Sequence, residues 1–235
     1  MRRPLREALF VFGLSVAANA AAKLLGVAIP FVGTIVHALV AAVFIYLPVA
    51  VAWRRKEDLA AYGFTLQPAR RSAAFAAGTI AAVFPPFLAG YVVFHGLACD
   101  LVLPAGMCAR FAGWAGLAHP RLPDGFVEAV LTQIIVIAIP EELFFRGYLL
   151  KRLEEAFPPR RRILGGGIGA ALVLSAFLFG LSHVLFDLNP MRMATFFPGL
   201  VFGWLRSATG SIAAGAAVHA ASNLYIAVLH RTFFP

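Results

Sequence analysis

The chain has 235 residues, of which 61% are hydrophobic and 13% are charged, and its formal net charge is +9. A soluble domain of this size could not cover so much apolar surface with polar groups, so the composition excludes an ordinary soluble protein and indicates an integral membrane protein. The positive charge does not indicate nucleic-acid binding, because the basic residues flank apolar runs and form no basic helix or patch interleaved with aromatic residues.

Long apolar runs predict an all-α, polytopic transmembrane bundle of about seven spans, since about 20 helical residues cross a bilayer. In chain order, we expect spans at residues 9–29, 31–53, 73–93, 126–150, 163–186, 191–205 and 212–229. The chain has no internal repeat and no low-complexity tract, which favours a single transmembrane domain over residues 1–235. Arg2, Arg3 and Arg6 precede the first run without a clear cleavage site, so we expect this span to be retained.

The orientation follows from the basic residues that lie outside the predicted spans. The side that holds the N-terminus carries fourteen of them and the other side carries four. Because Lys and Arg are enriched on the cytoplasmic side of membrane proteins, we expect a multi-pass protein of the cell (inner) membrane. Its N-terminus would be cytoplasmic and its C-terminus outside.

Cys99 and Cys108 both lie in the connection after the third predicted span. If that connection faces an oxidising compartment, the two can pair, which would stabilise the protein by roughly 2–3 kcal/mol. Two free thiols are the alternative. Neither cysteine belongs to a cluster with metal-ligand spacing.

The sixth predicted span is short, because its residues cover only about 23 Å of a ~30 Å hydrocarbon core. We therefore expect the preceding link, residues 187–190, to lie below the outer surface. Polar backbone at that depth is tolerated only where protein or water covers it, which predicts a water-filled cavity near the fifth and sixth spans.

Glu141 and Glu142 stand out because they lie side by side inside an apolar run. A carboxylate at membrane depth is costly, so an ionisable group there usually serves function and faces a partner or a wet cavity. Glu142 and Arg146 are four residues apart on one helical face, which is the spacing of an ion pair. Glu141 is rotated by about 100° from its neighbour, so it faces a different part of the protein.

Two other runs carry side chains at helical spacing. Phe179 and His183 are four residues apart, and so are His219 and Asn223. A lone buried histidine on an apolar helix is more often a hydrogen-bonded core residue than a catalyst, so each pair is a weak signal by itself. Together with the glutamates, they predict catalytic core motifs on three spans within residues 125–230.

These side chains can hydrolyse a peptide bond with an activated water molecule. Glu141, assisted by His183, can accept a proton from that water. His219 and Asn223 can donate hydrogen bonds to the oxyanion, which is the largest electrostatic contribution in acyl transfer. We expect these four residues to be catalytic.

The other members of the three pairs have supporting roles in this interpretation. Arg146 can neutralise Glu142, which leaves Glu141 as the reactive carboxylate. We expect Glu142, Arg146 and Phe179 to act structurally around the catalytic residues.

The same residues carry a resemblance to a known family. EELFFRG, FGLSH and HAASN match the EExxxR, FxxxH and HxxxN motifs of the CPBP family, the CAAX-protease, bacteriocin-processing and Abi-like membrane proteins. The resemblance covers residues 131–229, and it implies an intramembrane endopeptidase that cleaves near the C-terminus of a membrane-associated substrate. It also implies that Glu141 and His183 activate water, and that His219 and Asn223 stabilise the oxyanion.

Metal dependence is an open alternative. Glu141, His183 and His219 could together bind Zn²⁺ with a water in the fourth position, as in a zinc metalloendopeptidase. Against a metal, the chain has no HExxH pair, and Arg146 can hold Glu142, the obvious carboxylate to support a zinc ligand. We favour a metal-free, glutamic-type mechanism with no cofactor.

Two other functions compete with proteolysis. A non-catalytic immunity or scaffold protein of the same fold would have no need for all four catalytic-type residues. A transporter could also bury charges, but the chain lacks the repeats typical of transporters. The abundance of Ala, Gly and Arg suggests a GC-rich bacterial genome, so the expected partners are membrane lipid and a protein substrate with a hydrophobic C-terminal segment.

Overall fold

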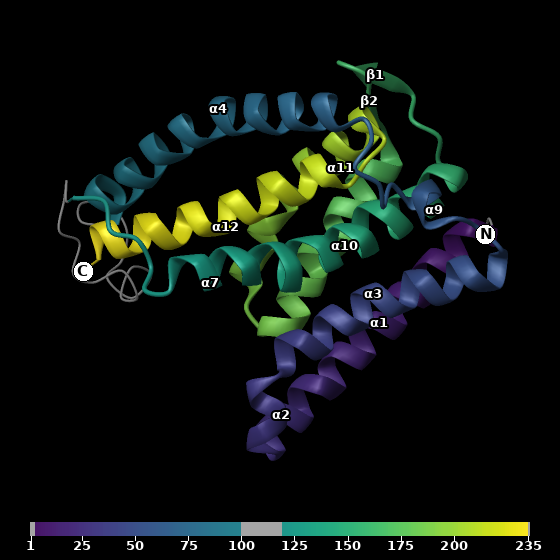
Figure 1. Ribbon diagram of the computed structural model, residues 1–235, viewed down its shortest axis with the longest axis horizontal. Helices are drawn as coiled ribbons and strands as arrows, with labels where there is room; N and C mark the ends of the chain where they lie inside the picture. Colours follow the sequence, from purple (N-terminus) through teal and green to yellow (C-terminus); the bar gives the residue numbers. More distant parts are fainter. Residues whose placement is uncertain (1–2, 100–118, 235) are drawn as a thin grey trace.

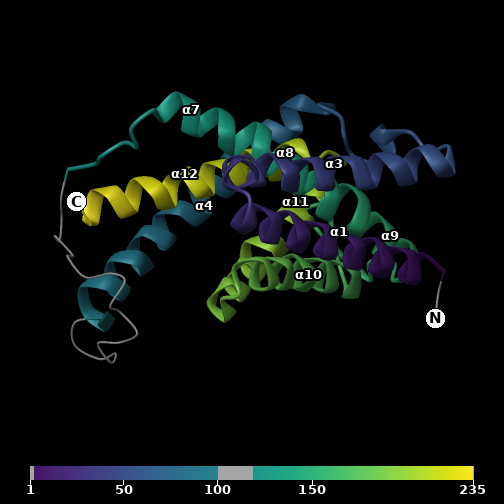
Figure 2. The ribbon, with the colours of Figure 1, turned by 90° about the horizontal axis from the view of Figure 1, so that it is seen from below.

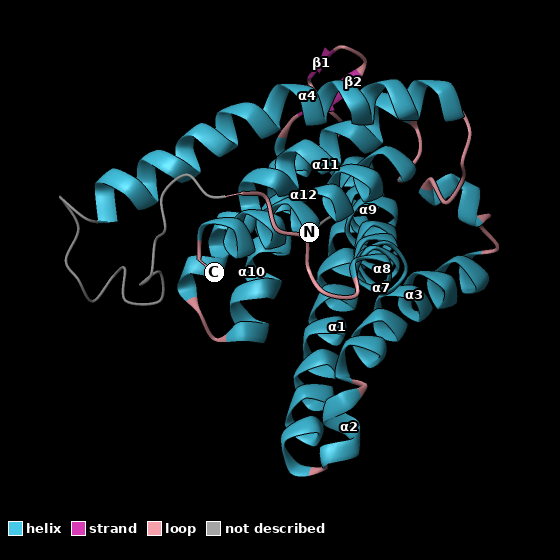
Figure 3. Ribbon diagram, turned by 60° about the vertical axis from the view of Figure 1, so that its left-hand side comes forward, coloured by secondary structure: helices cyan, strands magenta, loops and turns pink. Residues whose placement is uncertain are grey.

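The computed structural model describes residues 3–99 and 119–234, and most of them are helical (Figure 1 and Figure 3). The first half of the chain forms α1 (Arg3–Ala28), α2 (Pro30–Thr34), α3 (Val36–Arg55), a 3₁₀ helix (Leu59–Tyr62), α4 (Ala69–Val93) and a π-helical turn (Phe94–Ala98). Cys108 lies outside the described residues, so the pairing of Cys99 with Cys108 stays a prediction.

The second half begins with one continuous helical run, residues 126–156. It consists of α7 (Phe126–Leu131), a π-helical stretch (Thr132–Ala138), α8 (Ile139–Glu142), a second π-helical stretch (Leu143–Leu149) and α9 (Leu150–Ala156). Strands β1 (Arg161–Ile163) and β2 (Gly166–Ile168) follow, and then α10 (Ala170–Asp187), a 3₁₀ helix (Pro190–Thr195), α11 (Phe196–Thr209) and α12 (Ala213–Phe233).

The helices pack around the second half of this run, residues 138–156, whereas residues 126–137 are largely exposed. Helices α1 and α3 lie side by side as an arm that α2 closes at its tip, and α4 curves along α12 on the opposite side (Figure 1). The curvature of α4 includes Pro85 and Pro86, each of which removes a backbone donor from the helix interior. The described ends of the chain lie at opposite ends of the molecule (Figure 1 and Figure 2).

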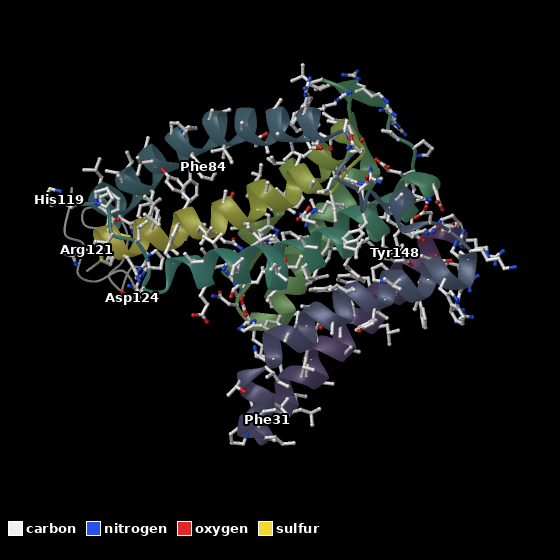
Figure 4. The ribbon with its side chains drawn as sticks, in the orientation of Figure 1. Phe31, Phe84, His119, Arg121, Asp124 and Tyr148 are labelled. Carbon is white, nitrogen blue, oxygen red and sulfur yellow. The ribbon has the colours of Figure 1, made fainter. Side chains whose placement is uncertain are left out.

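The hydrophobic core lies where the run 126–156 meets α1, α3 and α10. Phe144, Phe145 and Tyr148 are fully buried there, and Figure 4 labels Tyr148 beside α3. A helix that is apolar on all sides needs neighbours all round, so this segment forms the centre of the bundle. The buried turns at residues 143–149 directly follow Glu141 and Glu142 and therefore hold the two glutamates in a fixed position.

The prediction of an all-α bundle is confirmed, apart from one short antiparallel hairpin in which β1 pairs with β2. The hairpin corrects the fifth predicted span, which begins at Ala170 and not at residue 163. The apolar run suggested helix there, but Gly165 adopts φ +87°, a left-handed conformation that glycine accepts easily and that ends regular structure.

Four helices in the described part of the chain are long and apolar enough to cross a membrane: Arg3–Ala28, Val36–Arg55, Ala69–Leu97 and Ala170–Asp187. The run 126–156 is longer than any of them but carries the charged residues Glu141, Glu142 and Arg146, of which the last two are buried. Helix α11 has only 14 residues. The membrane character of the chain is therefore clear, while the count of about seven spans stays a prediction.

Candidate active site

Glu141 and Glu142 lie at the end of α8, between the two π-helical stretches. Pro140 begins this short segment; it has no backbone N–H to donate and would crowd the carbonyl four residues earlier in a regular α-helix. The π geometry accommodates such a break, and π-bulges are frequent at functional sites. The local sequence thus sets the helical rotation at which the two carboxylates leave the backbone.

Glu142 and Arg146 form the predicted ion pair. The distance from Arg146 Nη1 to Glu142 Oε1 is 2.9 Å, and the two side chains are 1% and 0% exposed. Arg146 Nη2 also donates to the carbonyl of Gly199 at 3.4 Å, and its guanidinium carbon lies 4.0 Å from the ring centre of Phe179. Hydrogen bonds and an aromatic face thus compensate a charge that would be very costly without them.

His219 contacts the same carboxylate. Its Nδ1 lies 3.1 Å from Glu142 Oε1, and its ring stacks on Phe202 at a centroid distance of 4.9 Å and an interplanar angle of 18°. A carboxylate accepts hydrogen bonds, so Nδ1 carries the proton and donates it to Glu142. The other ring nitrogen, Nε2, is directed to Glu141, whose Oε2 is 3.9 Å away.

His183 is oriented in a parallel way from α10. Its Nδ1 lies 2.9 Å from the carbonyl oxygen of Phe179, one helical turn earlier, so Nδ1 is again the donor. Its Nε2 lies 3.9 Å from Glu141 Oε2. The ring of Phe179 contacts both histidine rings edge-on, and the distance between ring centroids is 4.5 Å to His183 and 6.0 Å to His219.

Glu141 therefore lies where three helical segments meet: its own segment α8, α10 with His183, and α12 with His219. Its Oε2 is 3.9 Å from the Nε2 atoms of both His183 and His219. That oxygen is buried and accepts no hydrogen bond from the described residues. A separation of 3.9 Å exceeds hydrogen-bond length but is short enough for one small molecule to bond to both groups.

The hairpin explains how these residues reach the same depth. His183 is thirteen residues from the start of α10, and Glu141 is fifteen residues from the end of α9. The two helices run antiparallel from the turn that joins them, so similar residue counts give similar heights. The sunken link at residues 187–190 is not needed for this convergence, and its position relative to a membrane stays a prediction.

Asn223 makes no hydrogen bond with Glu141, His183 or His219. It lies one turn from His219 on α12, and its Nδ2 donates to Gln133 Oε1 at 2.8 Å. Gln133 belongs to the run 126–156, two turns before Glu141. The structure thus places Asn223 between α12 and the run 126–156, which also carries Glu141, and Gln133 holds its amide group.

Two features of the site escaped the sequence analysis. Phe202 on α11 forms the floor under the ring of His219. Gly215 on α12 leaves room for Glu142, since a Cβ atom there would lie 2.8 Å from Glu142 Oε2. The signal for Gly215 was present, because it precedes His219 by one helical turn and therefore shares its face.

A zinc ion is compatible with some of these contacts. Each histidine donates its Nδ1 proton to an oxygen and points Nε2 at Glu141, which is how zinc-binding histidines are usually held. Among residues 3–99 and 119–234, however, no group of three or more His, Cys, Asp or Glu side chains has the arrangement of a metal site.

Comparison with known proteins finds a family model that matches part of the chain. The family model described as type II CAAX prenyl endopeptidase Rce1-like matches residues 123–225. This interval contains the glutamate pair, Arg146, both histidines and Asn223. The search of curated proteins and the search of solved structures each found no match to the chain.

Proposed function

We propose that the chain, whose residues 123–225 match the type II CAAX prenyl endopeptidase Rce1-like family model, cleaves a peptide bond within the membrane by a metal-free mechanism. The match supports an endopeptidase in general, and the apolar helices support a membrane protein. The single observation that carries the proposed mechanism is the position of Glu141 Oε2, 3.9 Å from the Nε2 atoms of two histidines.

In the first step, Glu141 and His183 activate a water molecule. His183 has its proton on Nδ1, so its Nε2 lone pair can accept one hydrogen of the water while Glu141 accepts the other. The water oxygen attacks the carbonyl carbon of the substrate, and its proton passes to Glu141. General base catalysis of this kind contributes about 10²–10⁴ in rate.

In the second step, the negative charge on the substrate oxygen is stabilised from α12. The charge of Glu142 already balances Arg146, so His219, whose Nδ1 donates to Glu142, donates from Nε2 as an imidazolium whose charge the oxyanion itself balances. Asn223 provides a second donor from the next turn. The intermediate then collapses, the C–N bond breaks, and Glu141 returns the proton to the leaving nitrogen, which yields a carboxylic acid and an amine.

A zinc-dependent variant of this reaction is the second candidate. The observation in its favour is that both histidines are held by Nδ1 donation, with Nε2 directed to Glu141. Glu141, His183 and His219 would hold the ion, which would act as a Lewis acid and lower the pKa of a bound water.

The preferred substrate is an exported or membrane-associated protein with a hydrophobic C-terminal segment, which reaches a buried site through the lipid phase. We place the protein in the cell membrane with a cytoplasmic N-terminus and an outside C-terminus, on the distribution of basic residues. A reporter enzyme fused after residue 234 should be active only outside the cell, and activity only inside would contradict this orientation.

The function is tested with the purified protein in liposomes and a reporter that carries a hydrophobic C-terminal segment. Glu141→Gln should abolish cleavage while the fold and reporter binding remain, whereas Glu128→Gln, an exposed carboxylate of the same helical run, should leave cleavage unchanged. Equal cleavage by Glu141→Gln would contradict the mechanism and favour a non-catalytic immunity or scaffold protein. Loss of activity with a strong chelator and its return with Zn²⁺ would decide for the zinc variant.

A further inference from the structure

A group of cations gathers at the end of the molecule where α1 begins and α3 ends. Nitrogen-bearing side chains are concentrated there beside the N-terminus (Figure 4). A cavity of about 370 Å³ at this end is lined by Arg3, Pro4, Arg54, Arg55 and Glu57. A second cavity of about 440 Å³ shares two of these residues and is lined by Ala52, Trp53, Arg54, Lys56 and Glu57.

The acidic residue of these cavities does not neutralise them. Glu57 accepts hydrogen bonds from Arg55, Tyr62 and Arg152, so its charge is already used within the protein. Burial alone would raise its pKa, but the hydrogen bonds from Tyr62, Arg55 and Arg152 lower the pKa of Glu57 to about 2. Glu57 therefore stays ionised, but its charge is already paired with Arg55 and Arg152 and does not balance the other cations of the cavities.

Three cations around the cavities have no such partner. The side chains of Arg3, Arg54 and Lys56 make no ion pair or hydrogen bond with any part of the chain that the structure describes. Arg3, Arg54 and Lys56 are also exposed. Clustered cations repel one another, so a basic cavity whose cations have no acidic partners in the described residues is suited to an anion from outside the chain.

The position of the cavities indicates where that anion resides. Both Arg3–Ala28 and Val36–Arg55 are long and apolar enough to cross a membrane, and the cations occupy their adjacent ends. That is the level of lipid headgroups. Trp53 beside them is 81% exposed, and tryptophan is enriched at this interface because one part of its ring system is apolar and another is polar.

We propose that the cavities between the start of α1 and the end of α3 bind the phosphate headgroup of an anionic phospholipid, through Arg3 and Arg54. Lys56 contributes charge from the second cavity, and Trp53 inserts into the adjoining acyl-chain boundary. This site is distinct from the residues around Glu141 and does not depend on the proposed reaction. It would hold α1 and α3 at a fixed height relative to the lipid.

The test is a binding titration of short-chain phosphatidylglycerol to the full-length protein in neutral detergent micelles, with phosphatidylcholine as the neutral comparison. Arg3→Gln with Arg54→Gln should weaken phosphatidylglycerol binding roughly thirtyfold, since each basic residue near anionic lipid contributes about fivefold. The control is Arg160→Gln with Arg161→Gln, which removes the same charge from exposed residues outside both cavities. It should change binding less than about twofold.

Several results would overturn the proposal. Equal affinity for phosphatidylcholine would remove the role of the anionic headgroup, and equal losses in the two double variants would reduce the effect to net charge. Displacement of the lipid by an equal concentration of free glycerol phosphate would assign the site to a soluble phosphate. Binding of an oligoglutamate peptide that needs Arg3 and Arg54, without lipid binding, would assign it to an acidic protein segment. Unchanged thermal unfolding of the variants would show that a binding loss is not a folding defect.

Discussion

Glu142 Oε1 accepts from His219 Nδ1 at 3.1 Å and, on the same oxygen, from Arg146 Nη1 at 2.9 Å. One buried carboxylate therefore has two roles that the sequence could not separate: it compensates the charge of Arg146, and it fixes which nitrogen of His219 carries the proton. The interpretation of Glu142 as a partner of Arg146 alone was incomplete, because helical spacing detects a neighbour four residues away and not a histidine on another helix.

Arg146→Ala should destabilise the protein. The substitution would leave the fully buried Glu142 without its cation and would remove the guanidinium that packs on Phe179, at a cost of about 3–5 kcal/mol. We expect a markedly lower unfolding temperature in detergent. Arg160→Ala, at an exposed position, is the matched control and should leave it unchanged. An Arg146→Ala variant as stable as the parent would show that this pair does not hold the helix in place.

Gly215→Ala should reduce activity more than stability. The added Cβ would lie 2.8 Å from Glu142 Oε2, so the carboxylate must shift while its other oxygen is held by Arg146 and His219. A displaced Glu142 misdirects the His219 ring, and a misplacement of this order can reduce kcat about 10²-fold. Gly78→Ala is the control, because a Cβ atom on that helical glycine meets no atom within 4 Å. Equal activity of the two variants would contradict the positioning role of Glu142.

Gln133→Leu should lower kcat by a smaller factor than Asn223→Ala. Gln133 Oε1 holds the Asn223 amide at 2.8 Å, so its removal would leave that amide free to rotate without deleting it. Loss of an oxyanion donor such as Asn223 is expected to reduce kcat about 10²–10³-fold, and we expect about tenfold for Gln133→Leu. KM should change little in both. A larger effect of Gln133→Leu would mean that Gln133 itself contacts the substrate.

The stability of the protein should fall in acid through Glu57. The hydrogen bonds of this carboxylate lower its pKa to about 2 from 4.5, although burial opposes them. A depressed folded-state pKa means that the stabilisation is complete above the unfolded value and is lost as the pH falls from about 4.5 towards 2. Thermal unfolding in detergent between about pH 6 and pH 3 measures this loss, and Glu57→Gln should flatten the profile. Glu128→Gln should retain the slope of the parent, and an unchanged slope in Glu57→Gln would assign the acid sensitivity to other carboxylates.

The sequence alone determined the helical membrane class and selected the polar residues of the site. Both conclusions rest on local properties: apolar length sets a span, and the expense of a carboxylate at membrane depth singles out Glu141 and Glu142. Helical spacing likewise identified the Arg146 partner, because residues four apart share a face whatever surrounds them.

The tertiary structure decided everything that depends on residues distant in the chain. The turn at Gly165 shortened the fifth predicted span to α10 and set the depth of His183, which hydropathy could not detect because the turn is itself apolar. The contact between His219 and Glu142, and the space that Gly215 leaves for it, depend on how α12 packs against the run 126–156. Packing between helices is fixed by the complementary shapes of whole surfaces, and no local pattern of residues along one helix encodes it.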